Sequence, residues 1–308
     1  MSKTLASQSQ SKRWRVLRGG TEHLRVVLDN QLDQWQFRCV ATGKLDQLRN
    51  LLRSYESCLV AYSGGVDSVF LAYVAHEVLG KRTLAAIADS ASLPRRELTD
   101  ALDIAARFQI PVRIIQTKEF SNPDYLANPT NRCYFCKHEL FEELAPLAQR
   151  EGFAVLAYGE NASDTGDFRP GAKAAAEFQV RAPLKEVGLT KSEIRELSAQ
   201  LGLPTADKPQ MACLSSRVPY GEAVGLEKLK MIEQAEYVLR DLGFYDVRVR
   251  HHEMSNAHLA RIEIGPDEMS KLLTEGVFEA VATALKRIGY RHVTLDLEGY
   301  RRGSLNVT

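Results

Sequence analysis

The 308-residue sequence lacks long hydrophobic runs and has few cysteines. No apolar stretch approaches the roughly 20 residues needed to span a bilayer, and the polar start MSKTLASQSQSKRWR lacks the apolar core of a secretory signal. Five cysteines in a chain of this length do not make a disulfide framework, which favours thiol, metal-binding or catalytic roles in a reducing compartment. We therefore expect a cytoplasmic protein without a membrane partner.

An excess of charge of one sign is also missing. Forty Lys and Arg residues against 39 Asp and Glu residues leave a formal net charge of +1, so no global field attracts nucleic acid or an anionic membrane. Any anion must be held by local groups. The chain is long enough, at 44% hydrophobic residues, for one large core and a smaller one, which predicts two domains.

Short apolar strands alternate with helices from about residue 45, which predicts an α/β fold with a parallel sheet covered on both faces. The expected strands are 58–62, 83–88, 112–116 and 154–158, and the expected helices are 68–79, 94–108, 135–151 and 191–201. After about residue 217 the pattern changes to a long helix, two strands, two helices and a last strand. We expect a partly disordered extension over 1–44, with a helical pattern from Leu24 to Trp35, a parallel-sheet domain over 45–216 and a smaller α/β domain over 217–308.

The segment Ser63-Gly-Gly-Val-Asp-Ser68 follows an apolar strand and begins a helix. Backbone N–H groups and the helix dipole therefore converge there on a site for phosphate, which the glycines allow to approach closely. A bare Gly-Gly would be an ordinary turn, but the whole hexapeptide in this context is more specific, and it lacks the Gly-Lys-Ser/Thr of a Walker A loop. The predicted ATP-binding residues are Ser63, Gly64, Gly65, Val66, Asp67 and Ser68, with Asp67 helping to hold Mg²⁺.

Two further segments end predicted strands, where a parallel sheet places its nucleotide contacts. They contribute Ala88, Asp89 and Ser90 after the second strand, and Gly159, Asn161 and Asp164 after the fourth. Each segment alone is an ordinary loop or helix cap. Their shared position at strand ends favours a common nucleotide site.

Three cysteines form a second constellation. Cys133-Tyr-Phe-Cys136 places two thiols within reach of one ion or cluster, and Cys213 is a third candidate. A zinc site would need a fourth ligand, for which His138 is the only close candidate, and a redox pair would leave Cys213 unexplained. Three cysteines without a fourth ligand suit an iron–sulfur cluster with one open iron. Spacing alone leaves these three alternatives open.

The hexapeptide 63–68 resembles the SGGxDS loop of the PP-loop ATP pyrophosphatase superfamily, which cleaves ATP between the α and β phosphates. Together with the segments 90–97, 131–137, 207–217, 219–221 and 294–303, almost everything from about residue 45 to 305 resembles the LarE family. These enzymes are ATP-dependent sulfur transferases that help to build the nickel-pincer nucleotide cofactor of lactate racemase. The resemblance implies a PP-loop domain of the adenine nucleotide alpha hydrolase-like type over 45–216.

The resemblance also implies a reaction. The family adenylylates a carboxylate of pyridinium-3,5-biscarboxylate mononucleotide, releases pyrophosphate and converts the carboxylate to a thiocarboxylate. In one branch a cysteine at the position of Cys213 gives up its own sulfur; in the other, three cysteines hold a [4Fe-4S] cluster that carries a sulfide. The three-cysteine pattern here favours the second branch, with Cys133, Cys136 and Cys213 as ligands and with Cys213 and Asp67 as catalytic residues. The implied cofactors are ATP, Mg²⁺ and the cluster.

Arginines of the C-terminal domain offer forked donors for the substrate phosphate. The predicted substrate-binding residues are Arg217, Arg248, Glu263, Arg301 and Glu236, where the resemblance raises Arg248 and Arg301 above Arg250 and Arg302. The family also implies a homo-oligomer, in the form of a trimer-based hexamer, and partners in the nickel-pincer pathway.

Two rival functions stay open. A tRNA thiolase of the same superfamily can combine a PP-loop with a three-cysteine cluster, although the net charge and the lack of an added RNA-binding domain argue against a nucleic-acid partner. A noncatalytic nucleotide-binding module could instead use the cysteines as a redox sensor. Such a module would bind ATP without releasing pyrophosphate.

Overall fold

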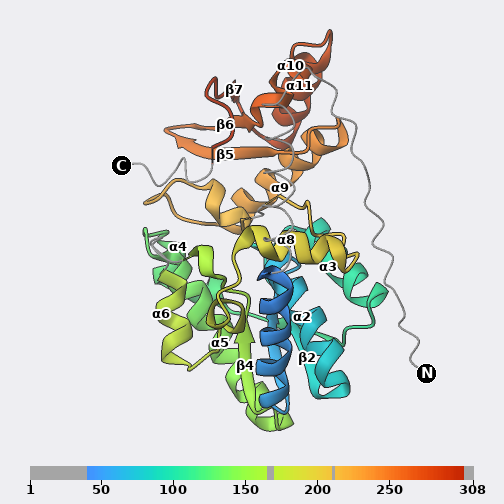
Figure 1. Cartoon of the computed structure of the whole chain (residues 1–308). Helices are drawn as coiled ribbons and strands as arrows, with labels where there is room; N and C mark the ends of the chain where they lie inside the picture. The colour runs from blue at the N-terminus through green and yellow to red at the C-terminus, as the bar shows by residue number, and fades with distance from the viewer. Residues whose placement is uncertain (1–39, 165–169, 210–211, 302–308) are drawn as a thin grey trace, which may run out of the picture. The chain divides into compact units, whose positions relative to one another are not determined.

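A computed structural model describes residues 40–164, 170–209 and 212–301 of the chain (Figure 1). The helix predicted near Leu24 to Trp35 and the candidate Arg302 lie outside the described residues. Residues 44–54 are helical and precede the first strand. In the described part of the chain, no helix is both long and apolar enough to cross a membrane.

The larger sheet has four parallel strands in the order β3-β2-β1-β4, which confirms the predicted α/β architecture. All five residues of β1 are buried because β1 lies in the sheet interior and helices cover both faces. One face of the sheet packs against Phe141 and Leu144 of the long helix α5. Helix α2 also contacts the sheet, at β1 and β2. The strands are β1 (Cys58–Tyr62), β2 (Thr83–Asp89), β3 (Val112–Gln116) and β4 (Val155–Tyr158).

The predicted helices of this region are present with small shifts at their ends. Helix α8 begins with a capping box, in which the side chains of Thr190 and Glu193 each accept a hydrogen bond from the other residue's backbone N–H. Helix α5 begins at Arg132 rather than at Phe135, so Cys133 and Cys136 lie inside its first two turns. The helices are α2 (Val66–Leu79), α3 (Arg95–Arg107), α4 (Pro123–Leu126), α5 (Arg132–Glu151), α6 (Pro170–Glu177), α7 (Pro183–Glu186) and α8 (Lys191–Gln200).

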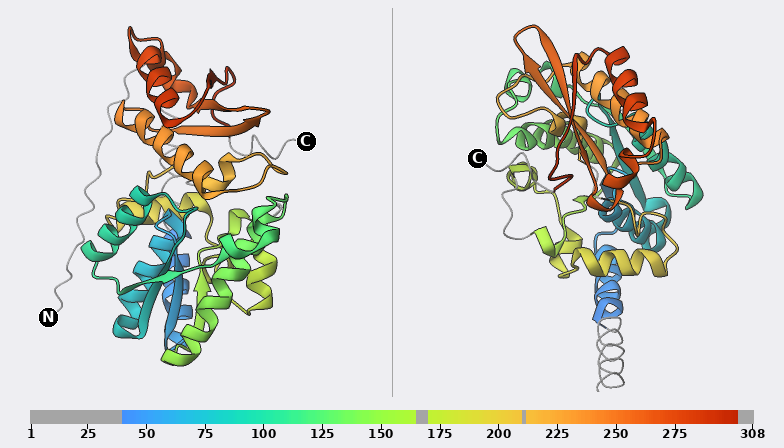
Figure 2. Two further views of the ribbon diagram at one scale, coloured as in Figure 1. Left: turned by 180° about the vertical axis from the view of Figure 1, so that it is seen from behind. Right: turned by 90° about the horizontal axis from the view of Figure 1, so that it is seen from above.

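A second, three-stranded sheet follows in the order β5-β6-β7 (Figure 2). Strands β5 (Val247–Met254) and β6 (Ala257–Ile264) are antiparallel, and β7 (His292–Leu295) runs parallel to β6. Helices α9 (Leu226–Asp241) and α11 (Val277–Ile288) pack on one face of this sheet and form a single apolar core with it. The short helix α10 (Met269–Leu272) adds apolar side chains to the same core. This is the smaller α/β region that the sequence predicts, while its boundary at residue 217 stays a prediction.

The alternation of side chains along β5 and β6 gives this small sheet two different faces. Val247, Val249 and Ile262 point into the apolar core. Arg248 and Arg250 alternate with them, and Arg248 is paired with Glu263 in the strand register. A row of charged side chains therefore occupies the face away from α9 and α11.

Candidate active site

The loop between β1 and α2 has a backbone that only glycine adopts without strain at one position. Gly64 has φ +71°, and a Cβ there would lie 2.6 Å from the Cβ of Ala101 on α3. The Ser63 N–H donates to Ser68 Oγ at 3.1 Å, and the two hydroxyl oxygens are also 3.1 Å apart. The loop therefore closes on itself directly before the N-terminus of α2, where the helix dipole favours an anion.

Asp67 lies in the first turn of α2 and has one carboxylate oxygen left over. Its Oδ2 accepts from Lys191 Nζ at 2.6 Å, whereas Oδ1 is buried and has no hydrogen-bond partner among the residues that the structure describes. Burial raises the pKa of Asp67, Lys191 opposes this, and the Asp164 carboxylate raises the pKa further. An orphaned buried carboxylate oxygen beside a phosphate loop, with a second carboxylate near it, is the donor set that fits Mg²⁺.

The segment after β4 packs directly on this loop. A Cβ at Gly159 would lie only 3.0 Å from the Ser68 backbone nitrogen, so the two chains are in close contact. Asn161 is buried, its N–H donates to Asp164 Oδ2 at 3.2 Å, and its Oδ1 accepts from the Ser163 N–H at 2.9 Å. The structure thus brings the predicted residues of β4 to those of the loop.

Strand β2 lies beside β1 in the sheet as far as Ile87, and Ala88 is paired with Ile115 of β3. Asp89 is paired with Arg95 and accepts from Gln116 Nε2 at 3.2 Å; the Arg95 hydrogen bond holds the pKa of Asp89 below its usual range. Ser90 donates to the buried carboxylate of Glu119 and lies 2.8 Å from the hydroxyl of Ser92. The nucleotide-binding roles of these residues stay predictions.

Two lysines at the loop were missed by the sequence reasoning. Lys191 contacts Asp67, and Lys208 Nζ lies 3.4 Å from the Gly64 carbonyl oxygen and 2.6 Å from Glu97. Lys191 directly follows the capping residue of α8. A lysine at a recognisable helix start was the only sequence feature that could have indicated its role. Its partner lies 124 residues earlier in the chain, and no local pattern connects the two.

The three predicted cysteines lie near one another. Cys133 is exposed, Cys136 and Cys213 are half-buried, and all three are free thiols. Burial raises the pKa of Cys136 to about 12, and Cys213 raises the pKa of both Cys136 and Cys133. The Arg132 guanidinium acts in the opposite direction and lowers the pKa of Cys133. The structure therefore brings Cys213 close enough to interact electrostatically with the two α5 thiols, which lie 77 and 80 residues earlier in the chain.

His138, the candidate fourth ligand of a zinc site, has other contacts in the structure. The His138 ring packs edge-on against Phe178 and lies 3.8 Å from Glu142, so its contacts are with its own helix and α6–α7 rather than with a cysteine. Among the residues described, no three His, Cys, Asp or Glu side chains are grouped to hold one metal ion. A cluster gives each cysteine its own iron, and three cysteines leave one iron open. The metal-binding role of Cys133, Cys136 and Cys213 stays a prediction.

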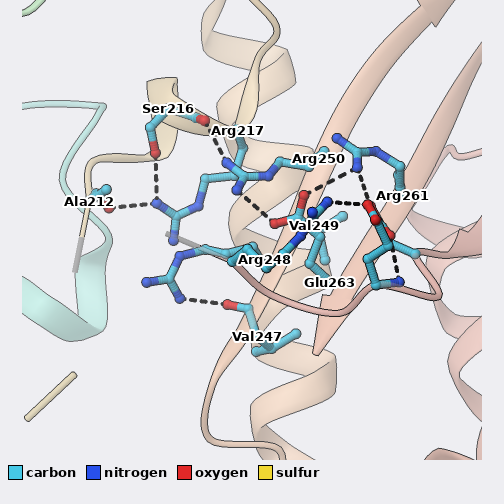
Figure 3. A network of polar contacts seen from close by, with 12 residues as sticks. Ala212, Ser216, Arg217, Val247, Arg248, Val249, Arg250, Arg261 and Glu263 are labelled. Atoms are coloured by element: carbon cyan, nitrogen blue, oxygen red, sulfur yellow. Dashed lines mark hydrogen bonds and ion pairs between the residues drawn. The ribbon is translucent and has the colours of Figure 1, made fainter. Parts of the chain in front are cut away.

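The predicted substrate residues form a largely buried network at the charged face of the small sheet (Figure 3). Arg217 is fully buried and paired with Glu236, with Nε–Oε1 and Nη2–Oε2 distances of 2.8 and 2.9 Å. Glu263 is also fully buried and accepts from Arg250 at 2.7 Å. Arg248 lies 3.9 Å from Asp246 and over the ring of Tyr300. Arg301, which is exposed, is paired with Glu298.

Comparison with known proteins connects both halves of this site. A family model described as NAD synthase matches residues 44–125, which include β1, the loop and β2. An uncharacterised protein of Synechocystis sp. is 45% identical over 264 residues, covering 86% of this chain and 97% of that protein. The pyridinium-3,5-bisthiocarboxylic acid mononucleotide synthase of Lactiplantibacillus plantarum is 33% identical over 259 residues, covering 83% of this chain and 91% of that enzyme.

A more partial match connects the chain to RNA modification. The tRNA-specific 2-thiouridylase of Azorhizobium caulinodans is 31% identical over 207 residues, which cover 54% of this chain and 53% of that enzyme. The match to the Lactiplantibacillus synthase, in contrast, spans nearly the whole of both chains. The similarity to that synthase therefore includes the small sheet as well as the parallel one.

Proposed function

This chain belongs to the LarE family of PP-loop enzymes, and we propose that it adenylylates a carboxylate of pyridinium-3,5-biscarboxylate mononucleotide and converts it to a thiocarboxylate. The synthase relative carries the choice of a pyridinium nucleotide as substrate. Assembly into a homo-oligomer and transfer of the product to nickel-pincer pathway proteins belong to the same proposal.

One observation supports this function above the others: the loop of Cys213 is fastened to the end of β2. The Leu214 N–H donates to the Ser92 carbonyl oxygen at 2.8 Å, and Ser92 in turn bonds Ser90. Ser90 ends the strand next to β1 and its phosphate loop. A carboxylate must be activated and then attacked by sulfur without leaving the pocket, so a thiol close to the nucleotide end of the sheet is what the reaction needs.

In the activation step, a carboxylate oxygen of the substrate attacks the α-phosphorus of ATP, and the bond to the β-phosphate breaks. The loop N–H groups with the Ser63 and Ser68 hydroxyls would hold the departing pyrophosphate. Mg²⁺ at Asp67 would neutralise phosphate charge, and Lys191 is placed to supply a further positive charge. The acyl group is thereby bonded to AMP, a far better leaving group than an oxide ion.

In the transfer step, sulfur attacks the acyl carbon and AMP departs with the former carboxylate oxygen. A [4Fe-4S] cluster held by Cys133, Cys136 and Cys213 would supply a sulfide as this sulfur atom. Without the cluster, the Cys213 thiolate would attack and form a thioester, and loss of the Cys213 Cα proton would then break its Cβ–S bond, which releases the thiocarboxylate and leaves dehydroalanine. Arg132 contributes a buried guanidinium that favours the negatively charged thiolate of Cys133. Sulfur nucleophiles need little base assistance at neutral pH.

The substrate phosphate would be held by Arg248 and Arg301. Burial and, after it, the neighbouring Arg217 charge lower the pKa of Arg248, and an anion bound beside its guanidinium would oppose both effects. Arg301 is exposed and can turn from Glu298 to a ligand. The substrate-binding roles of Arg217, Glu236 and Glu263 stay predictions: Arg217 and Glu236 are paired with one another, and Glu263 is paired with Arg250 and Arg261.

Pyrophosphate release measured with three acceptors tests the function. The full chain, prepared without oxygen, should release pyrophosphate from ATP with pyridinium-3,5-biscarboxylate mononucleotide and form a thiocarboxylate that mass spectrometry detects. Unmodified tRNA should give no release, and neither should ATP alone. Pyrophosphate release with tRNA alone would favour a tRNA thiolase, the class of the partial match. Release with neither acceptor would rule out both sulfur transferases and leave the noncatalytic sensor.

The cluster is tested by its visible absorption. Cys133→Ala should remove the brown chromophore from protein purified without oxygen, while the control Cys58→Ala, at a buried position within β1, should keep it. If Cys133→Ala retains both the chromophore and multiple turnovers, Cys133 is not a ligand of the sulfur-donating cluster.

A further inference from the structure

The peptide that carries Cys213 is held by side chains from the small sheet and its helix. We define the Cys213 loop as residues 212–217, which include the short turn Leu214–Arg217. Arg217 Nη1 donates to the carbonyl oxygen of Ala212 at 2.6 Å and to that of Cys213 at 3.0 Å. The Ser216 hydroxyl donates to the same Cys213 carbonyl at 2.7 Å. The main chain on both sides of the cysteine Cα therefore has fixed partners.

Arg217 is itself fixed by Glu236 of α9. The two side chains form a bidentate pair, and neither is exposed by more than 3%. Glu236 Oε1 also accepts from the Val249 N–H at 3.1 Å, which connects the pair to strand β5. One guanidinium thus spans from a carboxylate of the small domain to two carbonyls of the loop, a geometry that needs the planar fork of arginine.

A second arginine, Arg250, holds the loop in the same way at Ser216, three residues after Cys213. Arg250 of β5 donates to the Ser216 carbonyl oxygen at 2.8 Å and to Glu263 Oε2 at 2.7 Å (Figure 3). Glu263 is fully buried and lies 3.3 Å from Arg261. We call Arg217–Glu236 and Arg250–Glu263 the two straps of the Cys213 loop.

Residues of the parallel-sheet region also bind the Cys213 loop. Leu214 N–H bonds the Ser92 carbonyl, the Ser215 and Tyr125 hydroxyls are 2.7 Å apart, and Arg132 donates to the Ser215 carbonyl oxygen at 2.9 Å. All of these contacts use backbone groups or neighbouring hydroxyls, and none uses the Cys213 sulfur. The loop is fixed around a sulfur that stays available.

We propose that Arg217 and Arg250 are positioning residues for the sulfur of Cys213, through which the small sheet takes part in sulfur transfer. Buried ion pairs contribute little net stability compared with an apolar replacement, so their placement here is better explained by the geometry that they impose on the loop. The inference rests on the proposed function, because it assigns the straps to its second step. Activation of the carboxylate by ATP does not require them.

The variant Arg217→Lys tests the first strap, since lysine keeps the positive charge beside Glu236 but cannot serve two carbonyls and a carboxylate with one planar group. We expect thiocarboxylate formation to fall by about 100-fold, the loss typical of a reacting group displaced by about 1 Å. Pyrophosphate release with the pyridinium nucleotide should fall much less than thiocarboxylate formation, because the straps act in the second step. The matched control is Arg49→Lys, which alters an exposed bidentate pair with Glu77 at 3.0 Å.

A second readout does not depend on any enzymatic activity. In the reduced, cluster-free full chain, alkylation by iodoacetamide followed by peptide mass spectrometry gives separate rates for Cys213 and the exposed Cys133. Freeing the loop should raise the rate at Cys213 severalfold in Arg217→Lys, with Cys133 unchanged. Arg250→Lys should also raise the alkylation rate of Cys213. This second variant replaces Arg217→Lys in the test if Arg217→Lys does not fold.

The outcomes separate the two proposals. Pyrophosphate release that falls together with sulfur transfer, at an unchanged Cys213 alkylation rate, would show that Arg217 contacts the substrate instead of holding the loop. Unchanged sulfur transfer and alkylation in both variants would also overturn the positioning role. If the wild type releases no pyrophosphate with the pyridinium nucleotide, the proposed function fails, and the alkylation rates alone still decide whether the straps fix the loop.

Discussion

The phosphate loop and the strapped Cys213 loop are neighbouring parts of one site that are built in opposite ways. The phosphate loop consists of six consecutive residues, and the anion donors that we propose for it are backbone N–H groups and two serine hydroxyls. The Cys213 loop depends on charged side chains from α9, β5 and β6, up to 50 residues away in the chain. A local site can be recognised by its sequence pattern, whereas a site assembled from long buried side chains depends on the packing of a second domain.

The largest effect that we expect concerns the buried strap. Arg217→Met leaves the carboxylate of Glu236 buried without its partner, which should lower the free energy of unfolding by about 3–5 kcal/mol. Arg49→Met breaks the exposed pair with Glu77 and should cost less than about 1 kcal/mol. Urea titration of both variants measures the difference. Equal losses would mean that the two kinds of arginine pair are not distinct.

The phosphate loop should respond through its backbone. Gly64→Ala places a Cβ in contact with Ala101 at a residue with positive φ, so the loop must open, and we expect pyrophosphate release to fall by about 100-fold. The control Gly202→Ala has a similar φ of +69°, but its Cβ would meet no atom within 4 Å. It should show a stability loss of about 1 kcal/mol and normal activity. Normal activity in Gly64→Ala would show that the close contact with α3 is not needed.

The small domain should also be the more sensitive to acid. Burial, and then the charge of His258, lower the pKa of the fully buried His251 to about 4. In the unfolded chain His251 takes up a proton near pH 6.5, whereas in the folded chain it stays neutral down to about pH 4. The free energy of unfolding is therefore unaffected by His251 above pH 6.5 and decreases as the pH falls from 6.5 towards 4. We expect a loss of about 2 kcal/mol between pH 7 and pH 4.5, measured by chemical denaturation.

A matched variant isolates this contribution from that of other titrating groups. His251→Gln should reduce the pH dependence by the same amount, because glutamine does not ionise in this range. Hydrogen exchange should place the acid-induced opening in β5 and β6 rather than in the parallel sheet. An identical pH slope in wild type and variant would mean that His251 is already protonated in the folded state.

Much of the architecture could be predicted from local pattern. The apolar runs located the four described strands of the parallel sheet to within one residue at each end, because strands of a parallel sheet are largely apolar and are bounded by turn residues. The start of α5 was misplaced by three residues, since the Asn131 side chain makes no capping bond that would mark it. Instead, buried Arg132 is held by Ser215, a contact that the order of residues along α5 does not reveal.

The site was predictable only where its chemistry is local. Ser63 to Ser68 carry their function in one segment, but the ion pair of Asp67 with Lys191 joins residues on different helices. The predicted substrate arginines illustrate the same limit. Residue type and position in the chain made Arg217 a candidate phosphate ligand, yet its donors are directed at Glu236 and at two carbonyls of its own loop.

The sequence by itself determined the parallel α/β fold, the phosphate loop and the choice of three cysteines, because each depends on hydrophobic period or on residues whose chemistry is intrinsic. Only the tertiary structure decided how those parts meet. It gathered Cys213 with the α5 cysteines, left one oxygen of Asp67 without a partner and placed Arg217 and Arg250 across the Cys213 loop. The physical reason is that buried charges must find partners wherever the packed chain supplies them, at any distance along the sequence.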